Sequence, residues 1–345
     1  MFSSNVARMR RVDNPKNPYE SQVLEWVEEP PPYAELEIIE ERAKSILSEN
    51  ESPDIRFRYS LNPYRGCYHA CAYCYARPSH QYWGFGAGTD FERKIIVKVN
   101  APELLRARFE DKHWCGEPIA FSGNTDCYQP LEAARRLTRA CLELCAEYRN
   151  PVLLITKSAL IQRDLDVLQR LRDDASVRVF ISIPFDDDAQ ARLVEPGASA
   201  PRKRFEALRA LAEAGIDTGI AVAPIIVGLN DNQIPKLLAR AKEAGAKHAF
   251  KTALRLPREV APVFEARLRE AFPSAADKVM SGILQIRRGK KNESAFGDRM
   301  RGHGPRWDVV EDLFSVHCQR LGLHPPAEAL SPNTFRRPRG QLELL

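Results

Sequence analysis

Strand-like and helix-like segments alternate along most of this chain, and the alternation limits the folds that it can adopt. Seven apolar, strand-like stretches are expected, at 57–61, 94–99, 118–122, 152–156, 177–183, 219–226 and 248–254. Helix-like stretches fall between them, at 102–109, 131–148, 160–172, 202–214, 234–244 and 260–271. Gly215 and Gly245 each follow a predicted helix, as C-terminal caps commonly do. Strands alternating with helices of this length predict βαβ units and a parallel sheet.

Either two doubly wound sheets or a barrel would satisfy this alternation. Polar residues favour the barrel, because they recur where predicted strands end, at 122–126, Lys157, Ser182 and Arg255, and Pro224 marks the end of a further strand. In a β/α barrel that face carries the active site. Six βα units starting at residue 57 then form the barrel, and the strand at 94–99 becomes a peripheral extra.

The regions flanking the barrel have a different composition. Residues 1–33 are polar and end in three consecutive prolines, so they indicate an arm or linker. Residues 34–49 have helical periodicity and are expected to form a short amphipathic helix. We therefore divide the chain into an N-terminal arm and helix at 1–55, a barrel at 56–272 and a basic C-terminal extension at 273–345.

Three cysteines stand close together in the first barrel unit. Cys67, Cys71 and Cys74 have the spacing C-x3-C-x2-C, and the next cysteine along the chain is Cys115. Three thiolates on one loop can hold three corners of an iron–sulfur cube, leaving one iron open to another ligand. The spacing therefore predicts a [4Fe–4S] cluster with these three ligands.

Two other interpretations of the cysteines stay open. Structural zinc needs four nitrogen or sulfur ligands, and His69 could be the fourth only if it folded back within the same loop. A disulfide needs an oxidising compartment. The N-terminal segment lacks the apolar core of a secretory signal, and no apolar run is long enough to span a membrane, so reduced thiols in the cytoplasm are expected.

The cysteine motif resembles the signature of the radical SAM superfamily, which includes an aromatic residue before the third cysteine, here Tyr73. The resemblance implies a partial (β/α)6 TIM-like barrel with the cluster loop after its first strand. It also implies that S-adenosyl-L-methionine (SAM) binds the open iron. Reductive cleavage of SAM would then give methionine and a 5′-deoxyadenosyl radical, which abstracts a hydrogen atom. An external electron donor is implied.

The same resemblance implies which residues meet SAM. The turn after the second barrel strand would face the methionine amino group, and the fourth, fifth and sixth strands would contribute the remaining contacts. The residues at these places are Ser122, Gly123, Asn124, Thr125, Asp126, Ser182, Ile226, Gly228 and Arg255. Lys157 and Arg255 could also pair with a substrate phosphate. The simpler alternatives are a helix N-cap at Asp126, a turn-forming serine at 182, an ordinary buried strand at 220–228 and surface ion pairs for the cations.

Four segments together resemble one branch, the bacterial proteins related to spore photoproduct lyase, which are described as similar to DNA repair photolyases. They are 60–67, 125–132, 223–226 and 296–301. The resemblance implies repair of DNA photolesions by a lyase reaction. The lyase donates a hydrogen atom from a cysteine near the second-strand turn, and Gly123 occupies that place here. Cys127 and Tyr128, or Tyr75, are the alternative donors, which puts repair of spore photoproduct itself in doubt.

A basic segment follows the predicted barrel. Its positive side chains lie between residues 287 and 306, and glycines interrupt the run, so we expect a turn-rich ribbon. Such a ribbon could contact the phosphates of a nucleic acid, or it could be a solvated surface. Modification of RNA or of a peptide is the alternative activity. A further alternative is an iron–sulfur electron-transfer protein that never cleaves SAM.

Overall fold

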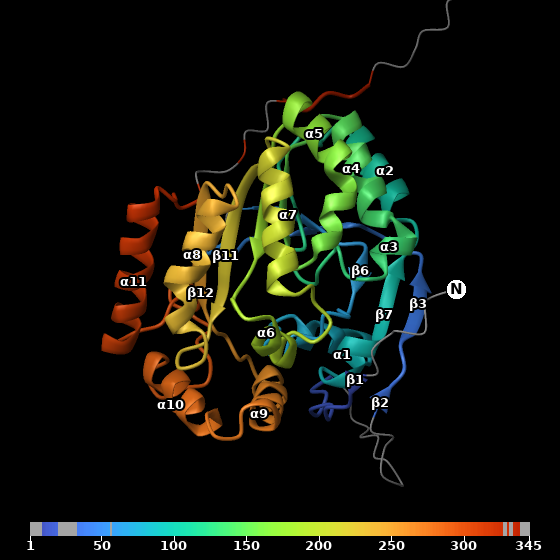
Figure 1. Ribbon diagram of the computed structural model, residues 1–345. Helices are drawn as coiled ribbons and strands as arrows, with labels where there is room; N and C mark the ends of the chain where they lie inside the picture. The colour runs from blue at the N-terminus through green and yellow to red at the C-terminus, as the bar shows by residue number, and fades with distance from the viewer. Residues whose placement is uncertain (1–8, 20–32, 56, 327–329, 331–333, 339–345) are drawn as a thin grey trace, which may run out of the picture.

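The main sheet of the protein is an incomplete barrel of parallel strands. The computed structural model describes residues 9–19, 33–55, 57–326, 330 and 334–338 (Figure 1). Seven strands follow the order β12-β11-β10-β9-β8-β5-β4, in which β4 (Leu47–Glu49) is antiparallel and lies at one edge. The six parallel strands are β5 (Tyr59–Leu61), β8 (Ile119–Phe121), β9 (Val152–Thr156), β10 (Val177–Ser182), β11 (Asp217–Ile225) and β12 (His248–Ala253). The predicted partial (β/α)6 barrel is confirmed.

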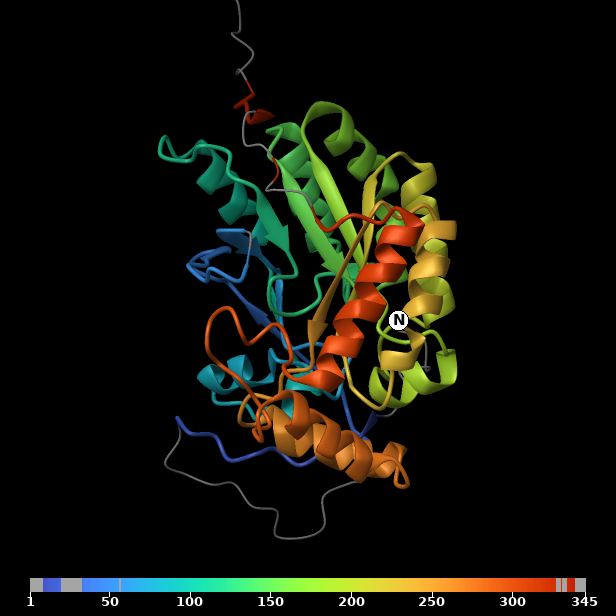
Figure 2. The same ribbon diagram turned by 90° about the vertical axis from the view of Figure 1, so that its left-hand side faces the viewer.

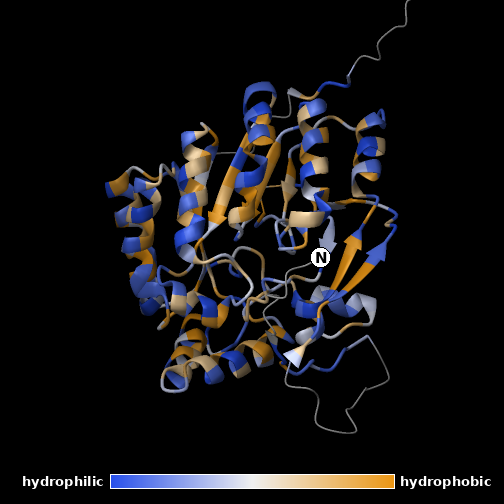
Figure 3. Cartoon of the chain, turned by 45° about the vertical axis from the view of Figure 1, so that its right-hand side comes forward, coloured by the Kyte–Doolittle hydropathy of each residue, from blue (hydrophilic) through white to orange (hydrophobic). Residues whose placement is uncertain are grey.

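Helices cover the outer face of this sheet because each carries one apolar stripe. The covering helices are α2 (Ala101–Glu110), α4 (Leu137–Glu147), α5 (Leu165–Asp174), α7 (Pro201–Glu213) and α8 (Ile234–Glu243). Leu168 and Leu208 are fully buried against strand residues such as Val179 and Ile220. Figure 3 shows the strands as mainly hydrophobic, while each helix has one hydrophobic and one hydrophilic side. Burial of these faces supplies the driving force for the barrel.

A second, small sheet replaces the helix predicted over 34–49, and that prediction is wrong. β3 (Glu37–Glu41) pairs in parallel with β7 (Lys94–Lys98), which also pairs with β6 (Tyr64–Arg65). Ile38 packs against the buried Ile95 and Val97, so tertiary pairing outweighs the helical spacing of apolar residues in this segment. The placement of 94–99 outside the barrel is confirmed, because β7 belongs to the small sheet.

The helix predicted over 131–148 is divided in two. Its parts are α3 (Glu132–Arg135) and α4, and the residue between them, Arg136, has a φ of 52°. The buried carboxylate of Glu132 accepts hydrogen bonds from the backbone N–H groups of Thr138 and Arg139. Glu132 thereby caps the first turn of α4, and the break follows from that local bond.

Several short helices gather at the carboxyl ends of the parallel strands. They are η1 (Arg77–Trp83), α1 (Thr89–Arg93), α6 (Asp188–Val194), α9 (Val260–Ala271) and α10 (Ala276–Ile286), and they lie at the lower end of the molecule in Figures 1 and 2. α6 packs on α9, and α9 on α10. Two 3-10 segments, η2 (Ala159–Asp164) and η3 (Asp231–Gln233), lead into α5 and α8.

The C-terminal extension contains more regular structure than a ribbon. α11 (Pro305–Leu321) packs on α8, and only residues 287–304 form the expected turn-rich segment. No helix within the described residues is long and apolar enough to cross a membrane. The division into segments at 55 and 272 stays a prediction, and part of the arm at 1–33 lies outside the described residues.

Candidate active site

The three cysteines lie on one tight loop that follows β6. Gly66, with a φ of 74°, begins the loop, and a Cβ at this position would lie 2.8 Å from the carbonyl oxygen of Lys94. The backbone N–H of Ala70 donates to the carbonyl of Cys67, and that of Cys74 donates to the carbonyl of Cys71. Cys67 and Cys71 are buried and Cys74 is partly buried. Successive turns therefore bring three thiols into one small volume.

This loop packs at the carboxyl ends of the barrel strands. Ala72 and Tyr73 share a buried apolar cluster with Phe185, Ile226 and Leu254, which follow the carboxyl ends of β10, β11 and β12 respectively. In a β/α barrel these strand ends form the active-site face. The cysteine loop therefore occupies the position that the polar residues at strand ends predicted for the site.

A buried arginine fixes the underside of the loop. Arg77 donates to the carbonyl of Cys71 at 2.9 Å and to the carbonyls of Ala87 and Gly88 at 3.0 and 3.1 Å. It also pairs with Glu92 at 2.6 Å, and the other oxygen of Glu92 pairs with Arg267 of α9 at 3.1 Å. This Arg77–Glu92–Arg267 relay ties the cysteine loop to α9. No sequence motif indicated Arg77 or Glu92.

A second buried pair fixes the third turn of the loop. The hydroxyl of Tyr73 donates to Glu195, and Glu195 pairs with Arg204 of α7 at 2.5 Å. Burial raises the pKa of Tyr73 well above its usual range, and the Glu195 charge adds to this effect. The residues Arg204 and Glu195 lie outside every recognised motif, so no sequence signal indicated them.

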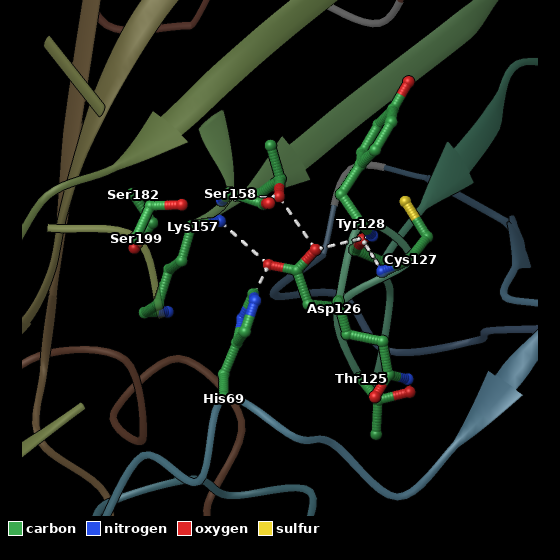
Figure 4. A network of polar contacts seen from close by, with 12 residues as sticks. His69, Thr125, Asp126, Cys127, Tyr128, Lys157, Ser158, Ser182 and Ser199 are labelled. Atoms are coloured by element: carbon green, nitrogen blue, oxygen red, sulfur yellow. Dashed lines mark hydrogen bonds and ion pairs between the residues drawn. The ribbon is translucent and has the colours of Figure 1, made fainter. Parts of the chain in front are cut away.

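Asp126 connects the turn after β8 to the end of β9 and to the cysteine loop (Figure 4). One carboxylate oxygen accepts from the Thr156 hydroxyl at 2.8 Å and the Tyr128 N–H at 2.9 Å. The other accepts from the Lys157 N–H at 2.8 Å and lies 3.4 Å from Nδ1 of His69. Burial alone would raise the pKa of Asp126, but His69 and these hydrogen bonds lower it to about 2.

The other predicted turn residues surround Asp126 in varied roles. Ser122, with a φ of 68°, accepts the N–H of Cys127, and the Thr125 hydroxyl donates to the carbonyl of Tyr64. Asn124 is exposed and donates to Ser79. The Gly123 carbonyl accepts from the Tyr75 hydroxyl at 3.1 Å, so Gly123 lies directly beside the cysteine loop. Contact between this turn and SAM stays a prediction.

The predicted contacts on the later strands are distributed in two places. The buried Ile226 packs with Cys71 and Tyr73, while Ser182 donates to the carbonyl of Ala223 at 3.2 Å. Gly228, with a φ of 85°, faces Arg306 of α11, whose Nη2 lies 3.1 Å from the Cβ position. Ile226 therefore borders the cysteine loop, whereas Gly228 marks the turn where α11 approaches the barrel.

Two cations border the loop. Lys157 lies with its ammonium 5.8 Å from the centre of the Tyr73 ring, and Arg255 lies 5.9 Å from the centre of the Tyr75 ring. Within the described residues neither side chain has an ion-pair partner, and the buried Nε of Arg255 has no acceptor. Burial lowers the pKa of Arg255, and the nearby Arg299 lowers it further. Both cations are therefore available to an anionic ligand.

The two proposed hydrogen donors point away from the loop. Cys127 is fully buried in the barrel core, and its side chain is directed away from His69 in Figure 4. Tyr128 is also buried, and its hydroxyl donates to Asp164 at 3.0 Å. Tyr75, in contrast, is half exposed beside Cys74. Among the three candidates, only Tyr75 lies at the mouth.

The thiols suit an iron–sulfur cube better than a single ion. No three metal-binding side chains within the described residues converge on one ion position. In a cube each thiolate binds a different iron, so convergence on one point is not required. Burial raises the pKa of the Cys67 thiol to about 12, and the neighbouring Cys74 adds to it, so its thiolate forms only when a bound cation stabilises it. The donor set therefore fits the cluster.

Comparison with known proteins agrees with this geometry. The family model described as "Radical SAM superfamily" matches residues 61–241. The uncharacterized protein Rv2578c of Mycobacterium tuberculosis is 34% identical over 224 residues, which are 64% of this chain and 66% of that protein, slightly less than two thirds of its length. The uncharacterized protein MJ0683 of Methanocaldococcus jannaschii is 32% identical over 198 residues, 57% of this chain and 71% of that protein.

Solved structures share the fold at low sequence identity. Spore photoproduct lyase complexed with dinucleoside spore photoproduct superposes with a TM-score of 0.61 and 17% identity, covering 84% of this chain and 81% of that chain. A point mutant of the same lyase, in which a tyrosine is replaced by phenylalanine, gives a TM-score of 0.60 with 16% identity and the same coverage. At this identity the likeness establishes the architecture.

Proposed function

The chain belongs to the radical SAM superfamily, and we propose that it abstracts a hydrogen atom from an organic substrate. Enzymes of this superfamily use a [4Fe–4S] cluster and S-adenosylmethionine as cofactors. When bound and reduced by an external donor, this cluster would supply the electron for cleaving SAM to methionine and a 5′-deoxyadenosyl radical. Cys67, Cys71 and Cys74 would hold the cluster.

The observation that carries this proposal is the position of the buried thiols. They lie at the carboxyl ends of parallel strands, between the Asp126 turn and the end of β11. The carboxylate of Asp126 can attract the ammonium of SAM, and the Lys157 ammonium can attract its carboxylate. The apolar residues around Ile226 exclude water from the same space. All eight cysteines are free, which fits a reducing compartment, and we infer the cytoplasm.

An electron-transfer protein is the alternative from another class. Such a protein needs no pocket for a second cofactor beside its cluster. Here an acidic turn, a free ammonium and an apolar strand end surround the thiols, and this arrangement favours SAM cleavage. Reconstitution of the cluster in the presence of SAM separates the two functions.

We infer that Tyr75 is the final hydrogen donor if the reaction ends by returning a hydrogen atom to the product. A Cβ at Gly123 would lie 2.7 Å from the Cβ of Ser60, so a cysteine at this position requires a local shift. The Tyr75 hydroxyl lies against the Gly123 carbonyl and is open to the mouth. This arrangement favours a tyrosine donor over the buried Cys127.

For the substrate, we infer a nucleic acid. Arg255 offers a half-buried guanidinium whose Nε lacks an acceptor, and the exposed Phe296 ring lies under Arg299 at 4.7 Å. A phosphate would satisfy the first group and a base could stack on the second. Lesion repair in DNA and modification of RNA both fit this chemistry. A peptide substrate fits it less well, because it offers fewer anionic groups.

The decisive experiment is anaerobic reconstitution with iron and sulfide, followed by reduction with dithionite in the presence of SAM. We expect the reduced cluster to give an electron paramagnetic resonance (EPR) signal that SAM perturbs, with slow formation of 5′-deoxyadenosine. Adding oligonucleotides that contain photolesions should increase that rate. A signal unaffected by SAM, with no 5′-deoxyadenosine, would favour the electron-transfer alternative. The Cys71→Ala protein is the matched control.

A further inference from the structure

Exposed aromatic rings gather at the end of η1, the 3-10 helix that follows the cysteine loop. Tyr82 and Trp83 are the last two residues of this helix, and they are 69% and 40% exposed. The ring centre of Tyr19 lies 4.7 Å from that of Tyr82, and the Tyr19 hydroxyl donates to the Tyr82 hydroxyl at 3.0 Å. Tyr19 is itself more than half exposed. A single exposed ring is ordinary, whereas three at one helix end indicate a ligand with flat apolar surfaces.

η1 is fixed to the rim of the candidate active site. The Asn124 side chain, on the turn after β8, donates to the Ser79 hydroxyl at 3.0 Å. A 3-10 helix has about three residues per turn and rises about 2 Å per residue, so Tyr82 lies on the Ser79 face, about 6 Å farther along. Tyr75, which is half exposed, contacts Gly123 of the same turn. The exposed rings therefore continue the edge of the mouth from the cysteine loop onto η1.

A cation lies against the Trp83 ring. The guanidinium carbon of Arg65, in β6, is 4.2 Å from the centre of this ring, which is close enough for a cation–π contact. Glu41 lies 3.7 Å from the Arg65 Nε, which is longer than a hydrogen bond, and this Nε has no acceptor within the described part of the chain. The Arg65 side chain is 36% exposed. The Trp83 ring therefore orients a guanidinium that keeps donors for an anion at the surface.

Flat rings beside an oriented cation match the chemistry of an unpaired nucleotide. A base offers a π-face to an aromatic side chain, and its phosphate offers oxygens to a guanidinium. The large exposed aliphatic side chains of the described residues, Leu193, Val309 and Val316, lie on α6 and α11. The rings on η1 are therefore not part of a wider apolar patch of the kind found at the centre of protein interfaces. In a duplex the base faces are already stacked on one another, so these rings suit a single strand.

We propose that Tyr82 and Trp83, together with Arg65, bind single-stranded nucleic acid by stacking on unpaired bases beside the nucleotide that enters the mouth. This inference rests on the proposed function, since it takes the substrate to be a nucleic acid, and it adds that the strand is unpaired where it crosses η1. It requires neither SAM cleavage nor a particular reacting base.

The test measures binding of a fluorescein-labelled thymidine oligonucleotide of about twelve nucleotides, alone and paired with its complement, to the reconstituted protein by fluorescence anisotropy. Stacking on one side chain changes affinity by at least about fivefold. Trp83→Leu and Tyr82→Leu should therefore bind the single strand at least about fivefold more weakly and bind the duplex unchanged. Trp83→Phe and Tyr82→Phe should keep the single-strand affinity, because each keeps a ring. The matched control is Tyr33→Leu, at an exposed tyrosine of β2 (Tyr33–Ala34), which should bind as the unchanged protein does.

Two further readouts separate stacking from charge and from a folding defect. Binding of the single strand should quench tryptophan emission because a base stacks on Trp83, and Trp83→Phe should lose most of this quenching while it keeps the affinity. The dependence of binding on salt should be unchanged in Trp83→Leu, and its slope should fall by about 0.7 in Arg65→Gln, the value for one phosphate of a single strand. Cluster content, measured by EPR, checks the fold of each variant. If Trp83→Leu loses its cluster, the quenching comparison with Trp83→Phe decides.

The outcomes distinguish this inference from the proposed function. Equal quenching in the unchanged protein and Trp83→Phe, or leucine variants that bind the single strand at full strength, would overturn the stacking platform alone. A loss of equal size for the single strand and the duplex would also overturn it, since stacking on unpaired bases cannot affect a duplex. Failure of the unchanged protein to bind either oligonucleotide would contradict the nucleic-acid substrate and this inference with it. SAM cleavage is assayed separately, so failure of the radical chemistry would be seen independently.

Discussion

The hydroxyl of Tyr73 donates to the buried carboxylate of Glu195, which lies 122 positions farther along the chain. Glu195 also neutralises Arg204, whose side chain is 1% exposed. Changing Glu195 to glutamine leaves the Arg204 guanidinium buried without a counter-charge, which should cost about 3 kcal/mol or more of unfolding free energy. Tyr73→Phe removes one hydrogen bond to this ionised carboxylate and should cost less, about 2 kcal/mol. Urea unfolding of the cluster-free proteins measures both values, and equal losses would contradict the assigned roles.

The cluster ligands should be separable from the other buried cysteines. Cys71→Ala is expected to abolish cluster binding, because its thiolate holds one corner of the cube. Cys127→Ala should keep the cluster, since Cys127 lies in the barrel core with its hydrogen-bonding partners. Iron and sulfide analysis with EPR decides the matter. Full cluster content in Cys71→Ala would exclude the three-cysteine assignment.

Gly197 limits how far the cysteine loop can move. A Cβ at this position would lie 2.0 Å from the carbonyl oxygen of Tyr68, and the Gly197 N–H donates to the carbonyl of His69. Gly197→Ala should therefore displace the loop and shorten the lifetime of the cluster in the presence of a chelator. Gly289→Ala is the control, because Gly289 has a φ of 83° and open space, so this change introduces backbone strain without a clash. Equal lifetimes in the two variants would contradict the prediction.

The basic segment divides into internal and external residues. Arg287 is 1% exposed and donates to the carbonyls of Leu254 and Arg301 at 2.6 and 2.7 Å, so it holds the segment on β12. Its expected role as a phosphate contact is not supported, because the side chain is buried and both of its Nη groups donate to backbone carbonyls. Arg299 is similarly engaged by Asp54 at 2.5 Å.

Arg288, Lys290 and Lys291 are exposed and stay predicted phosphate contacts, although Lys291 also pairs with Glu265 at 2.9 Å and Arg288 with Asp298 at 3.6 Å. Changing all three to alanine should weaken binding to DNA and reduce its salt dependence by about one unit in slope for each lost contact. Fluorescence anisotropy between low and high salt measures this slope. Arg170, Arg209 and Lys242, which are exposed on the outer helices, give a control with the same charge loss. An equal loss of DNA binding in the control would mean that the segment contributes only through its net charge.

Acid stability should depend on His80. Burial lowers the pKa of His80 to about 4 from an ordinary value near 6.5, while Asp90 partly opposes this shift. The unfolded chain therefore binds the proton more readily. The neutral His80 ring therefore contributes stability that is fully present above about pH 6.5. This contribution, up to about 3 kcal/mol, is lost as the pH falls toward 4.

His80→Phe should remove this pH dependence while keeping the ring contacts with Phe85 and Phe91. Urea unfolding of the cluster-free protein at several pH values between about 7 and about 4 measures the difference in slope. Asp126, whose pKa is lowered to about 2, is present in both proteins, so its own contribution to the pH dependence cancels in the difference between them. Parallel curves for the two proteins would contradict the assignment.

The barrel was predictable because its information is local. β9 and β10 are rich in β-branched residues, and α8 carries an apolar stripe on one face, so these elements are legible within a few neighbouring residues. The prediction for the segment at 37–41 was wrong because its strand forms only by pairing with β7, a partner more than fifty positions away. Helical periodicity could not reveal that partner.

The position of the cysteine loop was predictable because a motif fixes the spacing of the three cysteines and Tyr73, and their role as cofactor-binding residues stays a prediction. The buried ions Arg77, Glu92, Glu195 and Arg204 were missed because a charge within an ordinary helix or loop has no local signature of burial. Cys127 and Tyr128 differ from these ions, because both were predicted from the sequence as hydrogen donors and this role stays untested. Their type suggested chemistry, whereas the turn directs both into the core.

The Arg77–Glu92–Arg267 relay means that the family-matching stretch is not a self-sufficient module. Residues 61–241 contain the buried Glu92, but Arg267, one of its two cationic partners, lies outside them. Arg267 also donates to the carbonyl of Arg10, so the N-terminal arm takes part in the same connection. A chimera in which only residues 61–241 were exchanged between relatives would therefore contain Glu92 without its native partner Arg267. An exchange of this site between relatives therefore has to include the N-terminal arm and α9 together with the cysteine loop.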